Sequence, residues 1–131
     1  MTDLLPYFRG KYPALFSNNA LREIACLQGW LGLLDALCLE LQSYLDARPD
    51  VPRVCVLTVK EKFGGLRFYI HGGDQECRVM ILLAQERSLS ICEVCGQEGS
   101  LVGERWVSVR CPEHVGSPAE QLGDKPQGRG R

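Results

Sequence analysis

The chain has 131 residues, of which 45% are hydrophobic and 24% are charged, and its formal net charge at pH 7 is −1. These proportions are typical of one folded globular domain and exclude a disordered or fibrous chain. The near-zero charge disfavours a strongly electrostatic partner, because nucleic-acid-binding proteins usually carry a basic excess that neutralises phosphates.

Two features lead us to expect a cytoplasmic protein with no membrane partner. The first nine residues lack an apolar core of signal-peptide length, and the longest apolar stretch, residues 30–41, is too short to cross a membrane. Seven cysteines are an odd number, and four of them fall within apolar patterns that predict buried free thiols in a reducing compartment. These four are Cys26, Cys38, Cys55 and Cys77.

The N-terminal third predicts short helical segments followed by one long helix. Residues 3–17 are rich in aromatic side chains, and Pro6 and Pro13 limit a helix there to one or two turns. Residues 22–26 predict a second short helix, interrupted near Gly29. Beyond it, apolar side chains at three- and four-residue spacing predict the main core helix, which two prolines end. Its apolar positions are Trp30, Leu33, Leu34, Leu37, Leu41, Tyr44 and Leu45, and the prolines are Pro49 and Pro52.

A β-hairpin is the clearest local signal in the chain. Residues 53–62 are rich in β-branched side chains, Gly64 and Gly65 suit a two-residue turn with positive φ at both positions, and residues 67–71 return. This turn predicts the cross-strand pairs Phe63–Leu66, Lys62–Arg67, Glu61–Phe68 and Lys60–Tyr69. Strand alternation then directs an apolar set toward the helices: Cys55, Leu57, Val59, Phe63, Leu66, Phe68 and Ile70. The opposite face carries Lys60, Lys62, Arg67, Tyr69 and His71.

The C-terminal half predicts a second helix, a short strand and a disordered tail. Asp74 is a candidate N-cap for a helix that continues to about Ser88. Residues 106–110 predict a strand. Residues 115–131 are rich in glycine and proline and have almost nothing to bury, so we expect disorder there.

Four residues near the C-terminus have the spacing of a metal site. Cys92 and Cys95 form a Cys-x2-Cys pair, and after fifteen intervening residues Cys111 and His114 form a Cys-x2-His pair. Two such tight turns supply the four ligands of a tetrahedral zinc ion. Because these ligands fill the coordination sphere, we expect one structural Zn²⁺ rather than a catalytic one. The alternatives are chance cysteines, or a Cys92/Cys95 redox pair, which would need a thioredoxin-like strand and helix that the sequence does not predict.

Two sequence blocks carry a resemblance when they are taken together. One is residues 60–69 (KEKFGGLRFY), and the other combines residues 90–96 (SICEVCG) with residues 110–114 (RCPEH). The chain resembles a set of small proteins from bacterial, phage and prophage genomes over most of its length, from about residue 12 to residue 114. The resemblance implies an accessory protein, of the kind that includes phage host-takeover factors, antitoxins and immunity proteins, and therefore partner binding rather than metabolism.

The polar face of the hairpin is the second candidate site. Lys60, Lys62 and Arg67 lie on it with Tyr69, a combination that suits the phosphates and a stacked base of a nucleic acid. It equally suits an acidic surface of a protein partner, which the overall charge favours. The remaining interpretation is that these are solvated strand residues without a role.

Glu61 and His71 offer a third class of function, a small enzyme. Glu61 falls on the apolar face of the predicted hairpin, where a carboxylate is either paired or has a shifted pKa. His71 is the one histidine outside the predicted metal site, and a single histidine at a strand end is no catalytic signature. We therefore expect a protein that is not an enzyme.

The sequence as a whole predicts an α+β fold in which helices pack on a β-hairpin and a zinc-ribbon-like Cys3His knuckle follows. The expected parts are an α+β core (1–91), the knuckle (92–114), packed on the core or continuous with it, and the tail (115–131). The expected function is non-catalytic binding of a protein partner, of inhibitor, antitoxin or immunity type. Nucleic-acid binding is the alternative, and the oligomeric state is left open.

Overall fold

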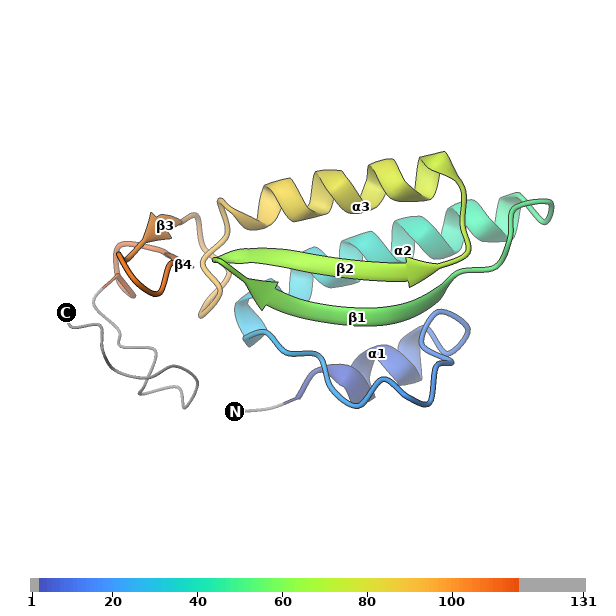
Figure 1. The fold of residues 1–131 in the computed structure, drawn as a ribbon, viewed down its shortest axis with the longest axis horizontal. Helices are drawn as coiled ribbons and strands as arrows, with labels where there is room; N and C mark the ends of the chain where they lie inside the picture. The colour runs from blue at the N-terminus through green and yellow to red at the C-terminus, as the bar shows by residue number, and fades with distance from the viewer. Residues whose placement is uncertain (1–2, 116–131) are drawn as a thin grey trace.

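The computed structural model describes residues 3–115, so the predicted disordered tail lies outside the described residues except for Val115. The fold is α+β, as predicted, with three α-helices and two small antiparallel sheets. The helices are α1 (Leu5–Lys11), the 3-10 helix η1 (Gln28–Trp30), α2 (Leu31–Ala47) and α3 (Gln75–Ser88). The strands are β1 (Cys55–Lys62), β2 (Gly65–His71), β3 (Ser100–Val102) and β4 (Ser108–Arg110). In Figure 1, α2 lies behind the β1–β2 hairpin, α3 runs along the β2 side, and α1 lies on the β1 side.

One hydrophobic core joins the helices to the hairpin, and the apolar face predicted for the long helix is buried in it. The buried positions of that face are Trp30, Leu33, Leu34, Leu37, Leu41 and Leu45. Trp30, Phe8 and Phe68 are among the largest fully buried side chains. Full burial of one large apolar side chain stabilises a fold by about 1.5–3 kcal/mol, so this shared core holds the layers together.

The turn of the β1–β2 hairpin is centred on Phe63 and Gly64, one residue earlier than predicted. Phe63 has a φ of 54° and Gly64 a φ of 86°, so a phenylalanine occupies the first position at which the sequence pattern predicts glycine. The predicted register is therefore wrong: near the turn, each β1 residue pairs two positions earlier on β2 than predicted. The observed pairs near the turn are Lys62–Gly65, Glu61–Leu66, Lys60–Arg67 and Val59–Phe68.

A register shift between Val56 and Thr58 changes which side chains of β1 face the core. Val56 and Val59 are both fully buried although they are three residues apart, which regular alternation does not allow. Leu57 and Phe63, both predicted to point inward, are 43% and 73% exposed. The bulge moves Leu57 outward, and the shifted turn does the same for Phe63.

The segment before α2 runs along the outer edge of β1. The Ala25 N–H donates to the Val59 carbonyl at 2.9 Å, and the Ala25 carbonyl accepts from the Glu61 N–H at 3.0 Å. Ala25 thereby forms a parallel bridge with Lys60. Residues 22–26 thus contain no helix, and that prediction is wrong.

Two side chains of α3 cover the outer edge of β2. The Leu66 N–H donates to Ser88 Oγ at 3.0 Å, and the Phe68 N–H donates to Gln85 Oε1 at 3.0 Å. These outward-facing amides of a two-stranded sheet therefore have hydrogen-bond partners inside the molecule.

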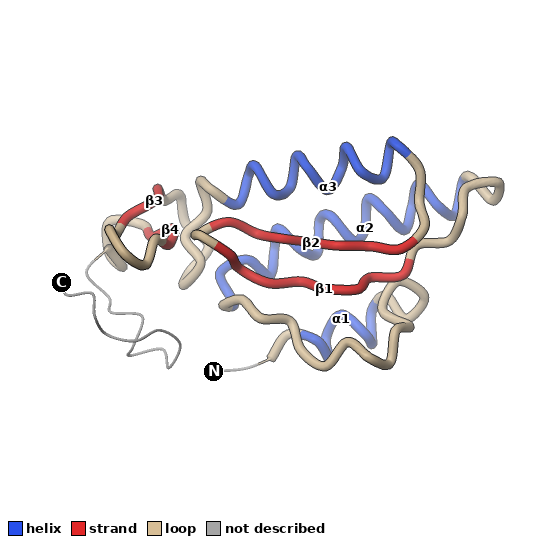
Figure 2. The backbone as a smooth tube through the Cα atoms, in the orientation of Figure 1, coloured by secondary structure: helices blue, strands red, loops and turns tan. Residues whose placement is uncertain are grey.

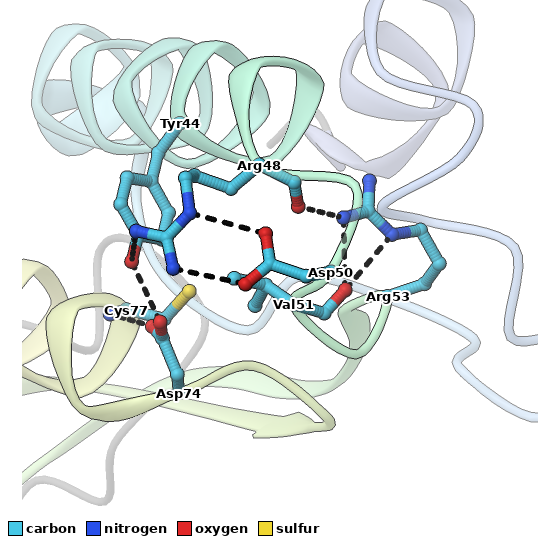
Figure 3. Close-up of polar contacts among 7 residues, drawn as sticks. All are labelled: Tyr44, Arg48, Asp50, Val51, Arg53, Asp74 and Cys77. Carbon is cyan, nitrogen blue, oxygen red and sulfur yellow. Dashed lines mark hydrogen bonds and ion pairs between the residues drawn. The ribbon is translucent and has the colours of Figure 1, made fainter.

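A polar network ties the end of α2 to the start of α3 (Figure 3). Asp74 is the N-cap of α3, as predicted, and its carboxylate accepts from the Cys77 N–H at 3.2 Å. Its second oxygen accepts from the Tyr44 hydroxyl at 2.6 Å. The Arg53 guanidinium donates to three carbonyl oxygens near the end of α2, those of Leu45, Arg48 and Val51. Both helix ends are therefore satisfied by named partners, which fixes α2 against α3.

Asp35 of α2 joins the long helix to the segment around α1. Its carboxylate accepts from the Tyr12 hydroxyl at 2.6 Å and from Lys11 Nζ at 2.9 Å. The Tyr12 hydrogen bond, followed by the Lys11 contact, holds the pKa of Asp35 below its usual value. The ionised carboxylate thereby links two segments that are far apart in the sequence.

We expect Asp35→Asn to destabilise the protein at neutral pH and this loss to disappear in acid. The folded-state pKa of Asp35 is depressed, so its contribution is present above the unfolded pKa of about 3.9 and is lost as the pH falls through the lower folded value. Thermal unfolding of both proteins at neutral pH and at about pH 2.5 measures this difference. A gap between the two proteins that stays the same in acid would contradict the assignment.

Candidate metal centre

The first ligand pair lies in a tight turn between α3 and β3. The Cys92 carbonyl accepts from the Gly96 N–H at 2.8 Å, and the Cys92 N–H donates to the Gln97 carbonyl at 2.7 Å. Gly96 has a φ of 87°, a left-handed conformation that residues with a side chain rarely adopt. The Gln97 N–H donates to Cys95 Sγ at 3.5 Å. The Cys-x2-Cys-Gly sequence thus forms a loop with an amide that supports negative charge on a sulfur.

Strands β3 and β4 bring the second ligand pair back to the first. They pair antiparallel, with Leu101 opposite Val109, and the Glu93 N–H donates to the Val109 carbonyl at 3.0 Å. Beyond β4, the His114 N–H donates to the Cys111 carbonyl at 2.9 Å and closes the second turn. The strand predicted over residues 106–110 is present as β4 in its last three residues.

The four predicted ligands converge. Their donor atoms all lie within 4.8 Å of one another. Cys95 Sγ is 3.6 Å from Cys111 Sγ, and His114 Nδ1 is 3.7 Å from Cys92 Sγ and 3.2 Å from Cys111 Sγ. With metal–sulfur bonds of about 2.3 Å and metal–nitrogen bonds of about 2.0 Å, tetrahedron edges measure about 3.8 Å between two sulfurs and about 3.5 Å between sulfur and nitrogen. The observed separations fit these edges, so the group could hold a metal ion.

Backbone amides stabilise the thiolate of Cys92. Burial raises the pKa of this thiol, but backbone hydrogen bonds from Cys111, Cys95 and Val94 lower it to about 6. The amide of Gln97 lowers the pKa of Cys95, while burial and the neighbouring thiols raise it overall. Several thiolates at this spacing repel one another, and a bound cation removes that repulsion.

A buried ion pair lies directly beside the ligands. Glu93 is 4% exposed and Arg110 is 3% exposed, and Arg110 Nη1 lies 3.6 Å from Glu93 Oε1. The same Nη1 donates to the Val109 carbonyl at 3.1 Å, whereas Arg110 Nε has no hydrogen-bond partner among the described residues. The sequence analysis did not predict this ion pair. The sequence feature that could have indicated it is that Glu93 directly follows the ligand Cys92 and Arg110 directly precedes the ligand Cys111.

Three hydrogen bonds join this region to the segment that leads into α2. The Leu27 N–H donates to Glu93 Oε2 at 3.0 Å, and the Gly29 N–H donates to the Glu93 carbonyl at 2.7 Å. The Trp30 indole N–H donates to the Ile91 carbonyl at 2.9 Å. A side chain at position 29 would collide with backbone oxygens of the knuckle, so glycine is required there. The knuckle is therefore bonded to the core through its ligand-bearing loop.

The predicted partner-binding residues share the open face of the β1–β2 hairpin, which is the face turned away from the core. Lys60 and Arg67 are directly opposite each other, whereas Lys62, predicted to face Arg67, pairs with Gly65. Tyr69 is 45% exposed. No helix covers the near side of the hairpin in Figures 1 and 2, and no salt bridge found among residues 3–115 includes these cations.

The two residues of the enzyme hypothesis lie at opposite ends of the same hairpin. Glu61 Oε2 accepts from the Gly64 N–H at 2.8 Å, at the turn. His71 ends β2 opposite Cys55. It lies five positions after Leu66, the partner of Glu61, which is about 17 Å of extended strand. The fold does not bring Glu61 and His71 together.

Among residues 3–115, no helix has both the length and the apolar character required to cross a membrane. Comparison of the chain with protein-family models, with curated proteins and with solved structures finds no match. Function is therefore inferred from the metal-ligand cluster and from the open face of the hairpin.

Proposed function

We propose that the protein is a non-catalytic binding protein, stabilised by one structural zinc ion, that acts by protein–protein interaction. The observation that carries this proposal is the open face, where two half-buried cations, Lys60 and Arg67, oppose each other in register and Lys62 and Tyr69 are exposed beside them. The resemblance to small accessory proteins of bacteria and phages supports a role of inhibitor, antitoxin or immunity type.

The donor set supports zinc as the metal. Three thiolates and one imidazole are soft ligands that suit Zn²⁺, whereas Ca²⁺ and Mg²⁺ prefer oxygen ligands. Four protein ligands leave no open position for water or substrate, which is the arrangement of a structural site. The ion holds Cys92, Cys95, Cys111 and His114 together as a zinc-ribbon-like knuckle.

The charges of the open face support an acidic partner. Like charges directly opposite each other on a sheet are destabilising, and Lys60 opposite Arg67 is such a pair. An anionic group placed between them would relieve this repulsion. Tyr69 adds an exposed ring with a hydroxyl group on the same face, and aromatic residues and arginine are enriched at protein interfaces.

We expect reversal of both charges, Lys60→Glu with Arg67→Glu, to weaken partner binding by about tenfold or more, because close charge pairs across interfaces contribute on the order of 1.5 kcal/mol or more. The tagged protein is incubated with a bacterial lysate, half of it treated with nuclease, and the retained species are identified and titrated. One protein retained in both halves, and lost by the variant, is the expected result.

The matched control is reversal of two exposed arginines away from the open face, Arg22→Glu with Arg78→Glu. This control should retain the partner as the unmodified protein does. Retention that disappears with nuclease would replace the proposal with nucleic-acid binding through the same cations. Equal retention by the Lys60/Arg67 variant would exclude the open face as the binding site.

A further inference from the structure

Phe63 combines high exposure with a backbone conformation that bulky residues avoid. Its side chain is 73% exposed, the largest value among the exposed large hydrophobic residues of the described chain. Its φ of 54° makes it the one non-glycine residue with positive φ in residues 3–115. Two-residue hairpin turns with positive φ at both positions prefer asparagine, aspartate or glycine at this position. Phenylalanine is therefore unfavourable here for the turn and gains little from burial.

No contact with another aromatic ring in residues 3–115 accounts for this choice of residue. The aromatic ring contacts of the described residues join Tyr7, Phe8, Tyr12 and Phe16, and none includes Phe63. The ring of Phe63 contacts the neighbouring Lys62, whose Nζ lies 5.5 Å from the ring centroid. Residues held in sparsely populated backbone conformations cluster at functional sites, and an observed outlier is a reason to look for a function.

Two partly exposed leucines lie against the glycines that follow Phe63. A Cβ built on Gly64 would meet the side chain of Leu101, and one built on Gly65 would lie 3.2 Å from Leu89 Cδ2, so both leucines lie against the turn. Leu101 is 48% exposed and Leu89 is 39% exposed. We call Phe63, Leu89 and Leu101 the tip surface. Figure 1 shows the turn end of the hairpin directed toward the β3–β4 part of the chain.

We propose that the tip surface and the open face form one continuous binding surface for an acidic protein, and that Phe63 enters an apolar pocket of that partner. This inference rests on the proposed function and adds the position and chemistry of the contact. Lys62 lies beside Phe63 in the chain, and Arg67 Nη1 lies close to Gly65, the first residue of β2 after the turn. An apolar pocket rimmed by carboxylates complements this arrangement, because it buries the ring at the centre and pairs the cations at the border.

A protein fits the tip surface better than a nucleic acid does. Leu89 and Leu101 are aliphatic, and bases and phosphates offer them little apolar surface to contact, whereas a phenylalanine alone could stack on a base. The formal net charge of −1 also gives the chain no general attraction to phosphates.

The proposal predicts opposite effects of one substitution on stability and on binding. Phe63→Asn relieves the turn, so the melting temperature should rise by a few degrees. Leu39→Asn, at an exposed position of α2 (58% exposed), is the control for changing an exposed apolar side chain without changing a turn, and it should give no such rise. A melting temperature lowered by Phe63→Asn would show that the ring stabilises the fold and would overturn the premise.

Binding is tested with a photoreactive benzoyl-phenylalanine placed at position 63 or, separately, at position 39, in the nuclease-treated lysate. We expect crosslinking to an acidic protein at position 63 only. Excess unlabelled wild-type or Leu39→Asn protein should compete this crosslink away, and Phe63→Asn should compete at least tenfold less well. Equal crosslinking at both positions, or a basic crosslinked protein, would overturn the inference.

The outcomes separate this inference from the proposed function. If Phe63→Asn competes as well as the wild type while the Lys60/Arg67 variant does not, the tip surface is excluded and the open face stands. If excess wild-type protein does not reduce any of the protein crosslinks, both proposals fail. Crosslinking to nucleic acid in untreated lysate, with no protein adduct after nuclease, would likewise overturn both.

Discussion

Replacing Cys111 by serine, or removing the metal with a strong chelator, is expected to unfold residues 92–114 while the core keeps its helices. The knuckle has few large apolar side chains to bury. Within residues 92–114, Val109 is the one aliphatic residue that is fully buried. Ordering costs about 1–2 kcal/mol of backbone entropy per residue, which one valine cannot offset. Metal binding supplies on the order of 10 kcal/mol or more to such a segment. Amide hydrogen exchange, compared with and without chelator, measures the loss residue by residue.

Cys55→Ser is the control for this experiment, because Cys55 is a half-buried thiol outside the ligand cluster. It should leave exchange in the knuckle unchanged and should not alter the metal content of the purified protein. Two results would contradict a structural zinc site. One is a knuckle whose exchange is the same after chelation, and the other is a purified wild-type protein that contains no zinc by elemental analysis.

The second large effect is expected at the buried ion pair, where Glu93→Gln should cost about 3–5 kcal/mol of unfolding free energy. The glutamine can still accept the Leu27 N–H, but it leaves the guanidinium of Arg110 buried without a counter-charge. Combining it with Arg110→Met removes both charges, and most of the loss should be recovered because an apolar side chain of similar length replaces the cation. Urea unfolding in excess zinc measures the four proteins of this cycle.

Excess zinc in this cycle keeps the metal site saturated, so that a lost ion is not mistaken for a lost ion pair. Arg78→Met, at an exposed position of α3, is the matched control and should change stability by less than about 0.5 kcal/mol. Two single losses that simply add in the double variant would show that Glu93 and Arg110 do not interact energetically.

The metal ligands could be predicted from sequence because their geometry is largely local. A two-residue gap fixes how Cys92 and Cys95 can point, and the same gap separates Cys111 from His114. The ion pair beside them could not be predicted in this way. Glu93 and Arg110 face each other only after β3 and β4 have folded back, and each residue alone resembles an ordinary surface charge.

The hairpin was predicted, but its register depends on tertiary structure that the local pattern does not contain. The Gly64–Gly65 pair has the better turn propensity, yet Phe63 and Gly64 form the turn, and this choice pairs buried Val59 with buried Phe68 and leaves Phe63 exposed. The helix predicted over residues 22–26 is false, although Leu21, Ile24 and Leu27 in and around it have a three-residue spacing. All three are buried as a helix would bury them, but the segment is not helical because the Ala25 backbone pairs with β1.

The occupied edges of the hairpin determine how another protein can approach it. Exposed strand edges invite foreign strands to add to a sheet, which serves peptide recognition in some domains and causes aggregation in others. Here the amides of Leu66 and Phe68 are held by α3, and Ala25 occupies the other edge. Strand addition along these stretches would require the protein to release its own hydrogen bonds first. A partner is thus directed to the side chains of the hairpin rather than to its backbone, and the short two-stranded sheet is protected from pairing with other copies of itself.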